Sequence, residues 1–170
     1  VLSAGADHIG ACGSLSRSLI VLLPRTGVEA RKVQLCDDEQ RALHTVVEAK
    51  IDGEWRVLDP SYGLTWRRPA DGELATVEDL ATDEALFRAG AAADPRYPAD
   101  RYNYRNVYHL RWSKFPGGPF LRDMLIRAGG DQWVRSVQTP ALYERPRILL
   151  VLFHTAASLV CFVLGWRLRR

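Results

Sequence analysis

The chain has 170 residues, of which 47% are apolar, and its net charge at pH 7 is +3. This length predicts one domain with enough apolar material for a core. The small basic excess is spread along the chain, which argues against a nucleic-acid-binding protein. The three cysteines, Cys12, Cys36 and Cys161, form no CxxC pair and indicate neither a disulfide framework nor a zinc site. We therefore expect three independent thiols, no metal and no cofactor.

The first predicted element is a helix that begins near Cys12. Apolar residues between Leu15 and Leu23 have the spacing of one helical face, and Pro24 and Gly27 end the helix. A cysteine at the start of a helix is easily activated, because free backbone N–H groups and the helix dipole favour the thiolate. The alternative at this position is an inert, buried cysteine.

Three strands are predicted to follow this helix. They cover Val28–Leu35, Ala42–Ile51 and Glu54–Pro60. The dipeptide Asp52-Gly53 separates the second strand from the third and is typical of a two-residue hairpin turn. The expected structure is therefore an antiparallel sheet whose second and third strands are hairpin neighbours.

The hairpin register brings a histidine and an aspartate together. If the turn has two central residues, Ile51 pairs with Glu54, and Val46 then lies opposite Asp59. His44 becomes the diagonal neighbour of Asp59 on the same face of the sheet. Diagonal neighbours lie roughly 7–8 Å apart at the backbone, within reach of these two side chains. The register therefore predicts a His44–Asp59 pair.

If the Cys12 helix packs on that face, a Cys12–His44–Asp59 triad assembles. Such a triad combines a thiol nucleophile, an imidazole base and a group that orients the base. Each residue also has a structural interpretation. A lone cysteine is often buried and inert, a lone strand histidine is usually hydrogen-bonded or solvated, and Asp59 before Pro60 can belong to a turn. The order and the register favour the triad.

The middle of the chain predicts two helices and a loop. Thr76 and Asp79 have the spacing of a helix start, and a helix over Val77–Ala92 is expected. The segment Asp94–Tyr108 is rich in Pro, Tyr and Arg and is expected to be an ordered loop. A short amphipathic helix is predicted over Phe120–Ala128, where two glycines close it.

Aromatic residues of this middle region have two interpretations. They either line a groove for an acyl acceptor or a peptide, or they pack the loop onto the core, and we expect the packing. The residues are Tyr97, Tyr102, Tyr104, Tyr108 and Trp112.

The last predicted element is an apolar helix over Ile148–Trp166. Its 19 residues contain no Asp, Glu, Lys or Arg, and arginines flank it on both sides. A membrane span needs roughly 20 such residues. His154, Thr155 and Ser158 weaken this prediction, and a buried helix of a soluble domain is the alternative. We expect a single-pass C-terminal helix. The flanking arginines do not indicate on which side of the membrane the preceding domain lies.

Residues 10–63 resemble the transglutaminase-like superfamily of cysteine enzymes. The motifs that carry this resemblance are "GAC", "GVEAR", "HTVVE" and "DGEWRVLDP", in that order. The resemblance implies that Cys12 is the nucleophile, that His44 is the general base and acid, and that Asp59 orients His44. It also implies a papain-like α+β core in which the Cys-bearing helix packs on an antiparallel sheet.

These observations divide the chain into three regions. Residues 1–66 are expected to form the transglutaminase-like catalytic core, 67–146 a helical and irregular extension packed on it, and 147–170 a transmembrane helix. Because the chain begins at Val1 rather than at Met, we expect further residues before it, including an additional oxyanion donor. The backbone N–H of Cys12 is the donor expected within this sequence.

The predicted activity is thiol-dependent acyl transfer or hydrolysis at a peptide or side-chain amide, through a thioester on Cys12. The expected partners are a peptide or protein acyl substrate and a membrane, contacted through Ile148–Trp166, and no nucleic acid. A catalytically silent, membrane-tethered module that binds a peptide or a partner protein is the alternative.

Overall fold

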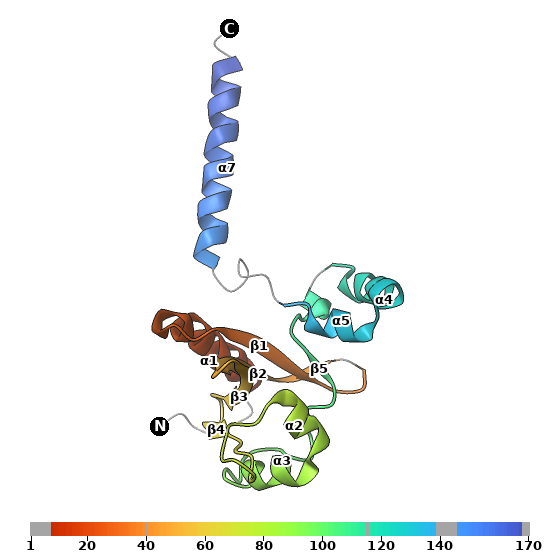
Figure 1. Ribbon diagram of the computed structural model, residues 1–170. Coiled ribbons are helices and arrows are strands. Elements are labelled where there is room, and N and C mark those ends of the chain that lie inside the picture. Colours follow the sequence, from red (N-terminus) through yellow and green to blue (C-terminus); the bar gives the residue numbers. More distant parts are fainter. Residues whose placement is uncertain (1–7, 40, 115, 139–145, 168–170) are drawn as a thin grey trace. The chain divides into compact units, whose positions relative to one another are not determined.

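The structure is a computed structural model that describes residues 8–39, 41–114, 116–138 and 146–167 (Figure 1). The chain divides into two compact units, Val1–Gln138 and Thr139–Arg170, and each is described by itself. The first unit is an α+β fold in which an N-terminal helix packs on a five-stranded antiparallel sheet and further helices follow. The predicted α+β class is confirmed at this level.

The sheet has the strand order β4-β3-β2-β1-β5, and all neighbouring strands are antiparallel. Its strands are β1 (Ala30–Cys36), β2 (Ala42–Ile51), β3 (Glu54–Asp59), β4 (Leu64–Thr65) and β5 (Val107–Tyr108). The three long strands were predicted within two residues at each end. The two-residue edge strands were not predicted, because so short a segment shows no alternation of apolar and polar residues.

The hairpin between β2 and β3 has the predicted register. Ile51 pairs with Glu54 across the turn. Asp52 and Gly53 have φ angles of 52° and 85°, so both central residues are in the left-handed region that a two-residue hairpin turn of this kind requires. The sequence of the turn thus fixes which residues of the two strands face each other.

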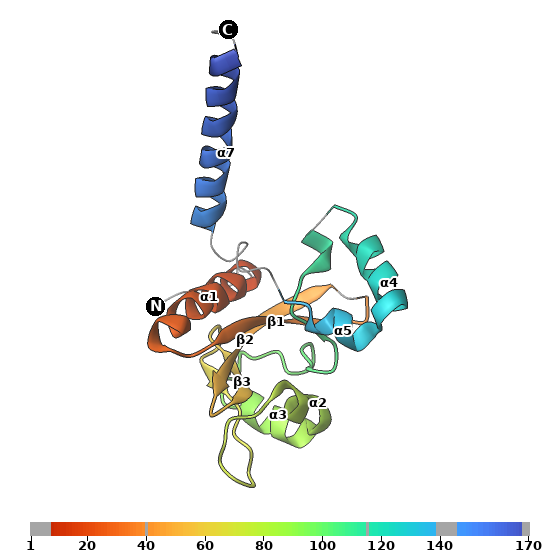
Figure 2. The same ribbon diagram turned by 45° about the horizontal axis from the view of Figure 1, so that its top comes forward.

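Helix α1 (His8–Leu22) packs on β1 and β2, and a 3₁₀ turn, η1 (Leu23–Thr26), follows it (Figure 2). Gly27 ends this segment with a φ of 83°, as predicted. The predicted start was wrong, because α1 begins four residues before Cys12. Residues 8–11 include neither a proline nor a serine, threonine, asparagine or aspartate that could cap a helix beginning at Cys12. The helix therefore extends upstream of Cys12 to His8.

One predicted helix is two helices in the structure. Thr76 and Asp79 form the predicted capping box at the start of α2 (Val77–Thr82). Asp83 then adopts an extended conformation, and its carboxylate accepts a hydrogen bond from the N–H of Leu86 at 2.9 Å. Asp83 therefore caps a new helix, α3 (Glu84–Ala91), and interrupts the apolar periodicity that predicted a single helix.

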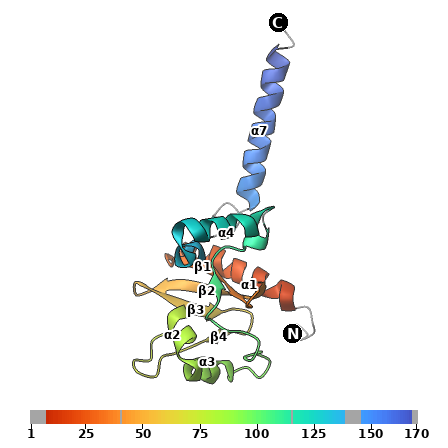
Figure 3. The same ribbon diagram turned by 90° about the vertical axis from the view of Figure 1, so that its right-hand side faces the viewer.

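Two further helices lie near β5. Helix α4 (Gly118–Gly129) was predicted, although it begins two residues earlier than expected with Pro119 in its first turn. Helix α5 (Asp131–Ser136) was not predicted. The 3₁₀ turn η2 (Trp112–Lys114) precedes α4 in the chain, and Figure 3 shows α4. This region has its own apolar cluster of Cys36, Tyr108, Leu110, Trp112 and Val134, with Leu125 and Ile126 packed against it.

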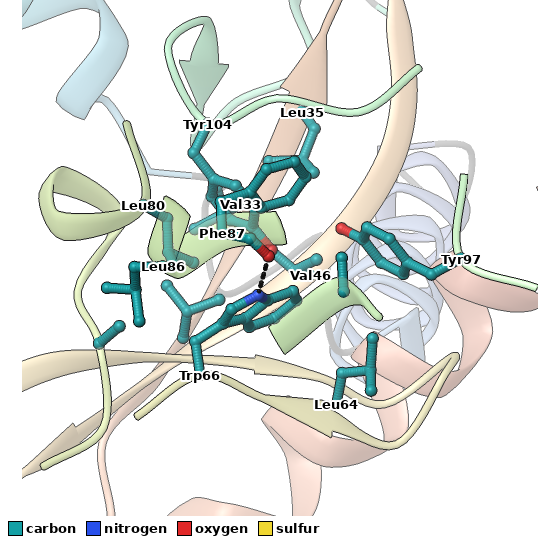
Figure 4. Packing of buried hydrophobic residues seen from close by; sticks show 13 residues of the cluster. Val33, Leu35, Val46, Leu64, Trp66, Leu80, Leu86, Phe87, Tyr97 and Tyr104 are labelled. Carbon is teal, nitrogen blue, oxygen red and sulfur yellow. Dashed lines mark hydrogen bonds between the residues drawn. The ribbon is translucent and has the colours of Figure 1, made fainter. Parts of the chain in front are cut away.

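The main core lies between the sheet and α2–α3. Val33, Val46 and Val57 of the sheet are fully buried and pack in one cluster with residues of these helices. Figure 4 shows Val33 and Val46 beside Leu80, Leu86 and Phe87. Trp66 is also fully buried, and its indole N–H donates to the carbonyl of Phe87 at 2.9 Å. Tyr97 and Tyr104 belong to the same cluster, so these two loop tyrosines pack onto the core as expected.

The second unit contains helix α7 (Pro146–Arg167). Five of its large apolar side chains are exposed: Leu150, Val151, Leu152, Phe153 and Leu159. Within the described ranges, no helix was found that combines the length and the apolar character needed to cross a membrane. The membrane span expected at Ile148–Trp166 stays a prediction.

The contact between α3 and Trp66 predicts a sensitive glycine. A Cβ atom on Gly90 would overlap the indole ring of Trp66. Gly90→Ala is therefore expected to lower the free energy of unfolding by about 1–3 kcal/mol, the usual cost of overpacking a core. Urea denaturation followed by circular dichroism measures it. Ala89→Ser, on the exposed side of the same helix, should change stability by less than about 0.5 kcal/mol; equal effects of the two variants would contradict this account.

Candidate active site

The predicted His44–Asp59 pair is present in the structure. The β2–β3 ladder runs from the pair Ile51–Glu54 to the pair Val47–Leu58. Continuing this register by one residue places Val46 opposite Asp59. The Nε2–H of His44 donates to Oδ2 of Asp59 at 2.6 Å. Both residues are buried, with 3% and 1% of their surface exposed. A bond this short between buried groups fixes the orientation of the imidazole ring and leaves Nδ1 for another partner.

The second oxygen of Asp59 shapes the turn after β3. Its Oδ1 accepts a hydrogen bond from the N–H of Ser61 at 3.0 Å. The sequence allowed two interpretations of Asp59, a partner of His44 or a turn residue. In the structure Oδ2 contacts His44 and Oδ1 holds the turn. Because the turn holds Oδ1, the carboxylate cannot rotate freely away from His44.

Cys12 lies near His44 but not at the start of its helix. It is the fifth residue of α1, in the second turn, where a backbone N–H is used within the helix. This position removes the reason for expecting its N–H as an oxyanion donor. Burial raises the pKa of the Cys12 thiol, but the hydrogen bond and charge of His44, together with contacts to Thr45, outweigh it and hold that pKa below its ordinary value. The activating partner is thus His44 rather than the helix dipole.

The pKa of His44 moves in the complementary direction. Burial lowers the pKa of the imidazole, but its hydrogen bonds to Asp59 and Cys12 and their negative charges raise it to about 9. Above the lowered pKa of Cys12 and below about pH 9, the pair is therefore a thiolate and an imidazolium. In this charge state the thiolate can attack as a nucleophile and the imidazolium can donate a proton.

A buried serine attaches α1 to the strand that carries His44. Ser16 is fully buried one helical turn after Cys12, and its hydroxyl donates to the carbonyl of Thr45 at 2.9 Å. The hydroxyl of Thr45 donates to Oε1 of Gln34 on β1 at 3.2 Å. These contacts fix the helix relative to β2 beside His44.

Three tyrosines surround the imidazole of His44. Tyr102 stacks on it with the ring centres 4.6 Å apart and the planes 5° from parallel, and Tyr62 and Tyr97 approach it edge-on at 5.6 and 6.5 Å. Burial raises the pKa of the Tyr102 phenol, and Tyr62 and the negative charge of Cys12 raise it further. Tyr102 thus contacts His44 and lies within the electrostatic reach of Cys12.

Sequence reasoning did not assign these aromatic contacts. Tyr102 was expected to pack the loop onto the core, with a substrate groove as the alternative, and Tyr62 was given no role. The signal was the number of tyrosines in the loop, but which of them reaches His44 depends on the path of the chain after α3.

The other histidines whose side chains the structure describes, His109 and His154, lie in different environments. His109 lies between the carboxylate of Glu48, at 2.9 Å, and the carbonyl of Arg135, at 2.9 Å. Nδ1 of His154 lies 2.8 Å from the carbonyl of Leu150 within α7. The side chain of His8 is outside the described residues. Among the described histidines, only His44 is paired with both an aspartate and a cysteine.

Comparisons with known proteins add no evidence about this site. No family model, no curated protein and no solved structure was found to match the chain. In the described part of the chain, no group of three or more His, Cys, Asp or Glu side chains is placed to hold a metal ion.

The Cys12–His44 pair predicts how alkylation depends on pH. Because the pKa of Cys12 is lowered, its reaction with iodoacetamide should begin at a pH below the ordinary thiol value of about 8.5 and slow on acidification. In His44→Ala the onset should move to higher pH. Peptide mass spectrometry gives the rate for each cysteine separately.

Cys36 is the internal control for this measurement. Burial and the charge of Asp37 raise the pKa of the Cys36 thiol to about 11, so Cys36 should react slowly throughout the same range. Coincident pH profiles for Cys12 in the native protein and in His44→Ala would show that the two groups do not interact.

Proposed function

We propose that the protein is a transglutaminase-like cysteine enzyme that transfers or hydrolyses the acyl group of a peptide or side-chain amide. The observation that carries this proposal is the buried, 2.6 Å bond between His44 and Asp59, with Cys12 held against the same imidazole. Nucleophile, base and orienting carboxylate come from α1, β2 and β3, and the helix packs on an antiparallel sheet. In this proposal the first unit has a papain-like core.

The charge states define the first half of the reaction. The Cys12 thiolate attacks the carbonyl carbon of the amide, and electrons move to the carbonyl oxygen. When the tetrahedral intermediate collapses, the C–N bond breaks and the imidazolium of His44 gives its proton to the leaving amine. The products of this half are a free amine and a thioester on Cys12.

The second half reverses the role of His44. Now neutral, the imidazole takes a proton from water or from an acceptor amine, which attacks the thioester and releases the thiolate. Water gives hydrolysis, and an amine gives transfer. Asp59 keeps Nε2 engaged throughout, so Nδ1 remains the nitrogen that exchanges the proton.

A reactive ester tests for the thioester. With p-nitrophenyl acetate, attack by Cys12 should release p-nitrophenolate and leave one acetyl group on the peptide that contains Cys12, detected by mass spectrometry. Asp59→Asn should slow this step by roughly 10²- to 10⁴-fold while the circular dichroism spectrum stays native, because the imidazole loses its charged orienting partner.

Two cysteine variants are the matched controls. Cys12→Ala should take up no acetyl group at residue 12 and release no burst of p-nitrophenolate, whereas Cys36→Ala should behave as the native protein does. Equal and slow acetylation of Cys12 and Cys36 in the native protein would contradict the enzyme and favour the silent binding module.

We further propose that α7 holds the protein at a membrane. The run Ile148–Trp166 lacks Asp, Glu, Lys and Arg. Two of its polar side chains are paired within the helix: Nδ1 of His154 lies 2.8 Å from the carbonyl of Leu150, and the hydroxyl of Thr155 donates to the carbonyl of Val151 at 2.8 Å. Such internal hydrogen bonds reduce the cost of placing polar groups in lipid.

Deletion of Ile148–Arg170 tests the anchor. The full chain should float with phosphatidylcholine vesicles in a density gradient and resist carbonate extraction, because its apolar helix is in the lipid. The shortened chain should stay in the aqueous fractions and remain monomeric. If the full chain is monodisperse without detergent and the shortened chain aggregates, α7 is a packed helix and the anchor is wrong.

A further inference from the structure

The loop after α3 reaches the imidazole of His44 through the side chain of Tyr102. The two rings lie face to face, with their planes 5° from parallel and their centres 4.6 Å apart. Tyr102 is half-buried, whereas His44 is only 3% exposed. A cation within about 6 Å of the centre of an aromatic ring is attracted to the face of that ring. Tyr102 therefore presents its ring face to the group that is a cation in the proposed reaction.

The position of Tyr102 is set by the core on both sides of it in the chain. Tyr97 and Tyr104 are only 6% and 1% exposed and belong to the main apolar cluster. Tyr97 also approaches Tyr102 edge-on, with the ring centres 5.5 Å apart and the planes at 81°. Because these two buried rings attach the loop to the core, residue 102 is held beside β2 by packing.

Tyr62 connects the hydroxyl end of Tyr102 to the turn after β3. The hydroxyl of Tyr102 is hydrogen-bonded to that of Tyr62, and the ring of Tyr62 approaches His44 edge-on at 5.6 Å. Tyr62 directly follows Ser61, whose N–H donates to Oδ1 of Asp59. The carboxylate that bonds to the imidazole through Oδ2 thus also shapes the turn that carries Tyr62. The contacts form a closed ring that begins and ends at Asp59.

The titratable groups that face the imidazole of His44 are Asp59, Cys12, Tyr62, Tyr97 and Tyr102. Burial lowers the pKa of the imidazole, but Asp59 and Cys12 raise it to about 9. Burial also raises the pKa of the Tyr102 phenol, so this ring is neutral when the imidazole is charged. The face of a neutral phenol ring is the negative part of its quadrupole. Tyr102 therefore favours the cation, as the two anions do.

We propose that Tyr102 is a positioning residue that stacks on the protonated imidazole of His44, holds the plane of that ring and stabilises its charge. Tyr62 holds Tyr102 in this position through the hydrogen bond between the two hydroxyls. The inference rests on the proposed function, because it concerns the imidazolium that gives its proton to the leaving amine. The stacked ring favours the thiolate–imidazolium pair over the neutral pair.

Replacement of Tyr102 in the full chain tests this role. Tyr102→Leu keeps an apolar cover but removes the ring face, so it should lower the pKa of His44 by about 0.5–1 pH unit, measured by nuclear magnetic resonance of ¹⁵N-histidine-labelled protein. The onset of Cys12 alkylation should move to higher pH, because the thiolate loses part of its counter-charge. Tyr102→Phe keeps the ring face and should leave both measurements nearly unchanged.

Two further variants separate this effect from a change in folding. Incorporation of 4-cyanophenylalanine at position 102 keeps the shape of the ring but withdraws electrons from its face, so it should lower the pKa of His44 as leucine does. Tyr104→Phe alters the same loop, but the ring of Tyr104 contacts Trp66 and Phe87, so the pKa should not change.

A double-mutant cycle tests the role of Tyr62. Tyr62→Phe and Tyr102→Phe each remove the same hydrogen bond, so each should lower the urea midpoint of unfolding, and the double variant should lower it no further than one of them does. Additive losses would show that the two hydroxyls act independently and that Tyr62 does not hold Tyr102.

These experiments distinguish the role of Tyr102 from the proposed enzyme activity. A native His44 that titrates near 6.5 would contradict the thiolate–imidazolium pair, but its pKa would still fall in Tyr102→Leu if the stacked ring stabilises the cation. A native pKa near 9 that leucine and 4-cyanophenylalanine both leave unchanged would overturn the role of Tyr102 alone. An equal fall of the pKa in Tyr104→Phe and in Tyr102→Leu would also overturn it.

Discussion

The structure of the candidate site depends on one interaction, the buried hydrogen bond between His44 and Asp59. Two ionisable groups with almost no exposed surface are stable together only if each neutralises the other and their remaining polar atoms have partners. Asp59 meets this condition with its second oxygen, which accepts from the backbone after β3. The second partner of His44 is Cys12. Because the pKa of Cys12 is lowered, its thiolate places a negative charge beside the imidazolium.

The surrounding fold serves to hold this pair in place. The hairpin turn fixes the register that places His44 next to Asp59. The hydrogen bond from Ser16 to the backbone of Thr45 holds α1 against β2, one turn away from Cys12. Tyr102 covers one face of the imidazole, and a stacked aromatic ring favours the cationic form electrostatically. Loop, helix and hairpin therefore all stabilise the same charge state.

The parts of the site that the sequence predicted are those set by local rules. The Asp52-Gly53 turn determines the pairing of its two strands, so the His44–Asp59 contact followed from counting residues. The position of Cys12 in α1 was predicted wrongly, because the only sequence signal for the start of that helix is Asp7, a residue type common at helix N-caps, which lies five residues before Cys12. The stacking of Tyr102 on His44 joins residues 58 positions apart, and its geometry follows from the path of the chain after α3, which no local pattern encodes. The division between α2 and α3 rests on one capping aspartate within an apolar repeat.

The charge state of His44 tests the central claim most directly. Nuclear magnetic resonance of ¹⁵N-histidine-labelled protein, titrated from pH 5 to pH 10 and assigned with His44→Gln, follows both ring nitrogens. The ring of His44 should stay an imidazolium through pH 8 and lose its proton near pH 9, and Cys12→Ser should lower this pKa because the thiolate charge is gone. A native His44 that titrates near 6.5, or a pKa that Cys12→Ser leaves unchanged, would contradict the thiolate–imidazolium pair.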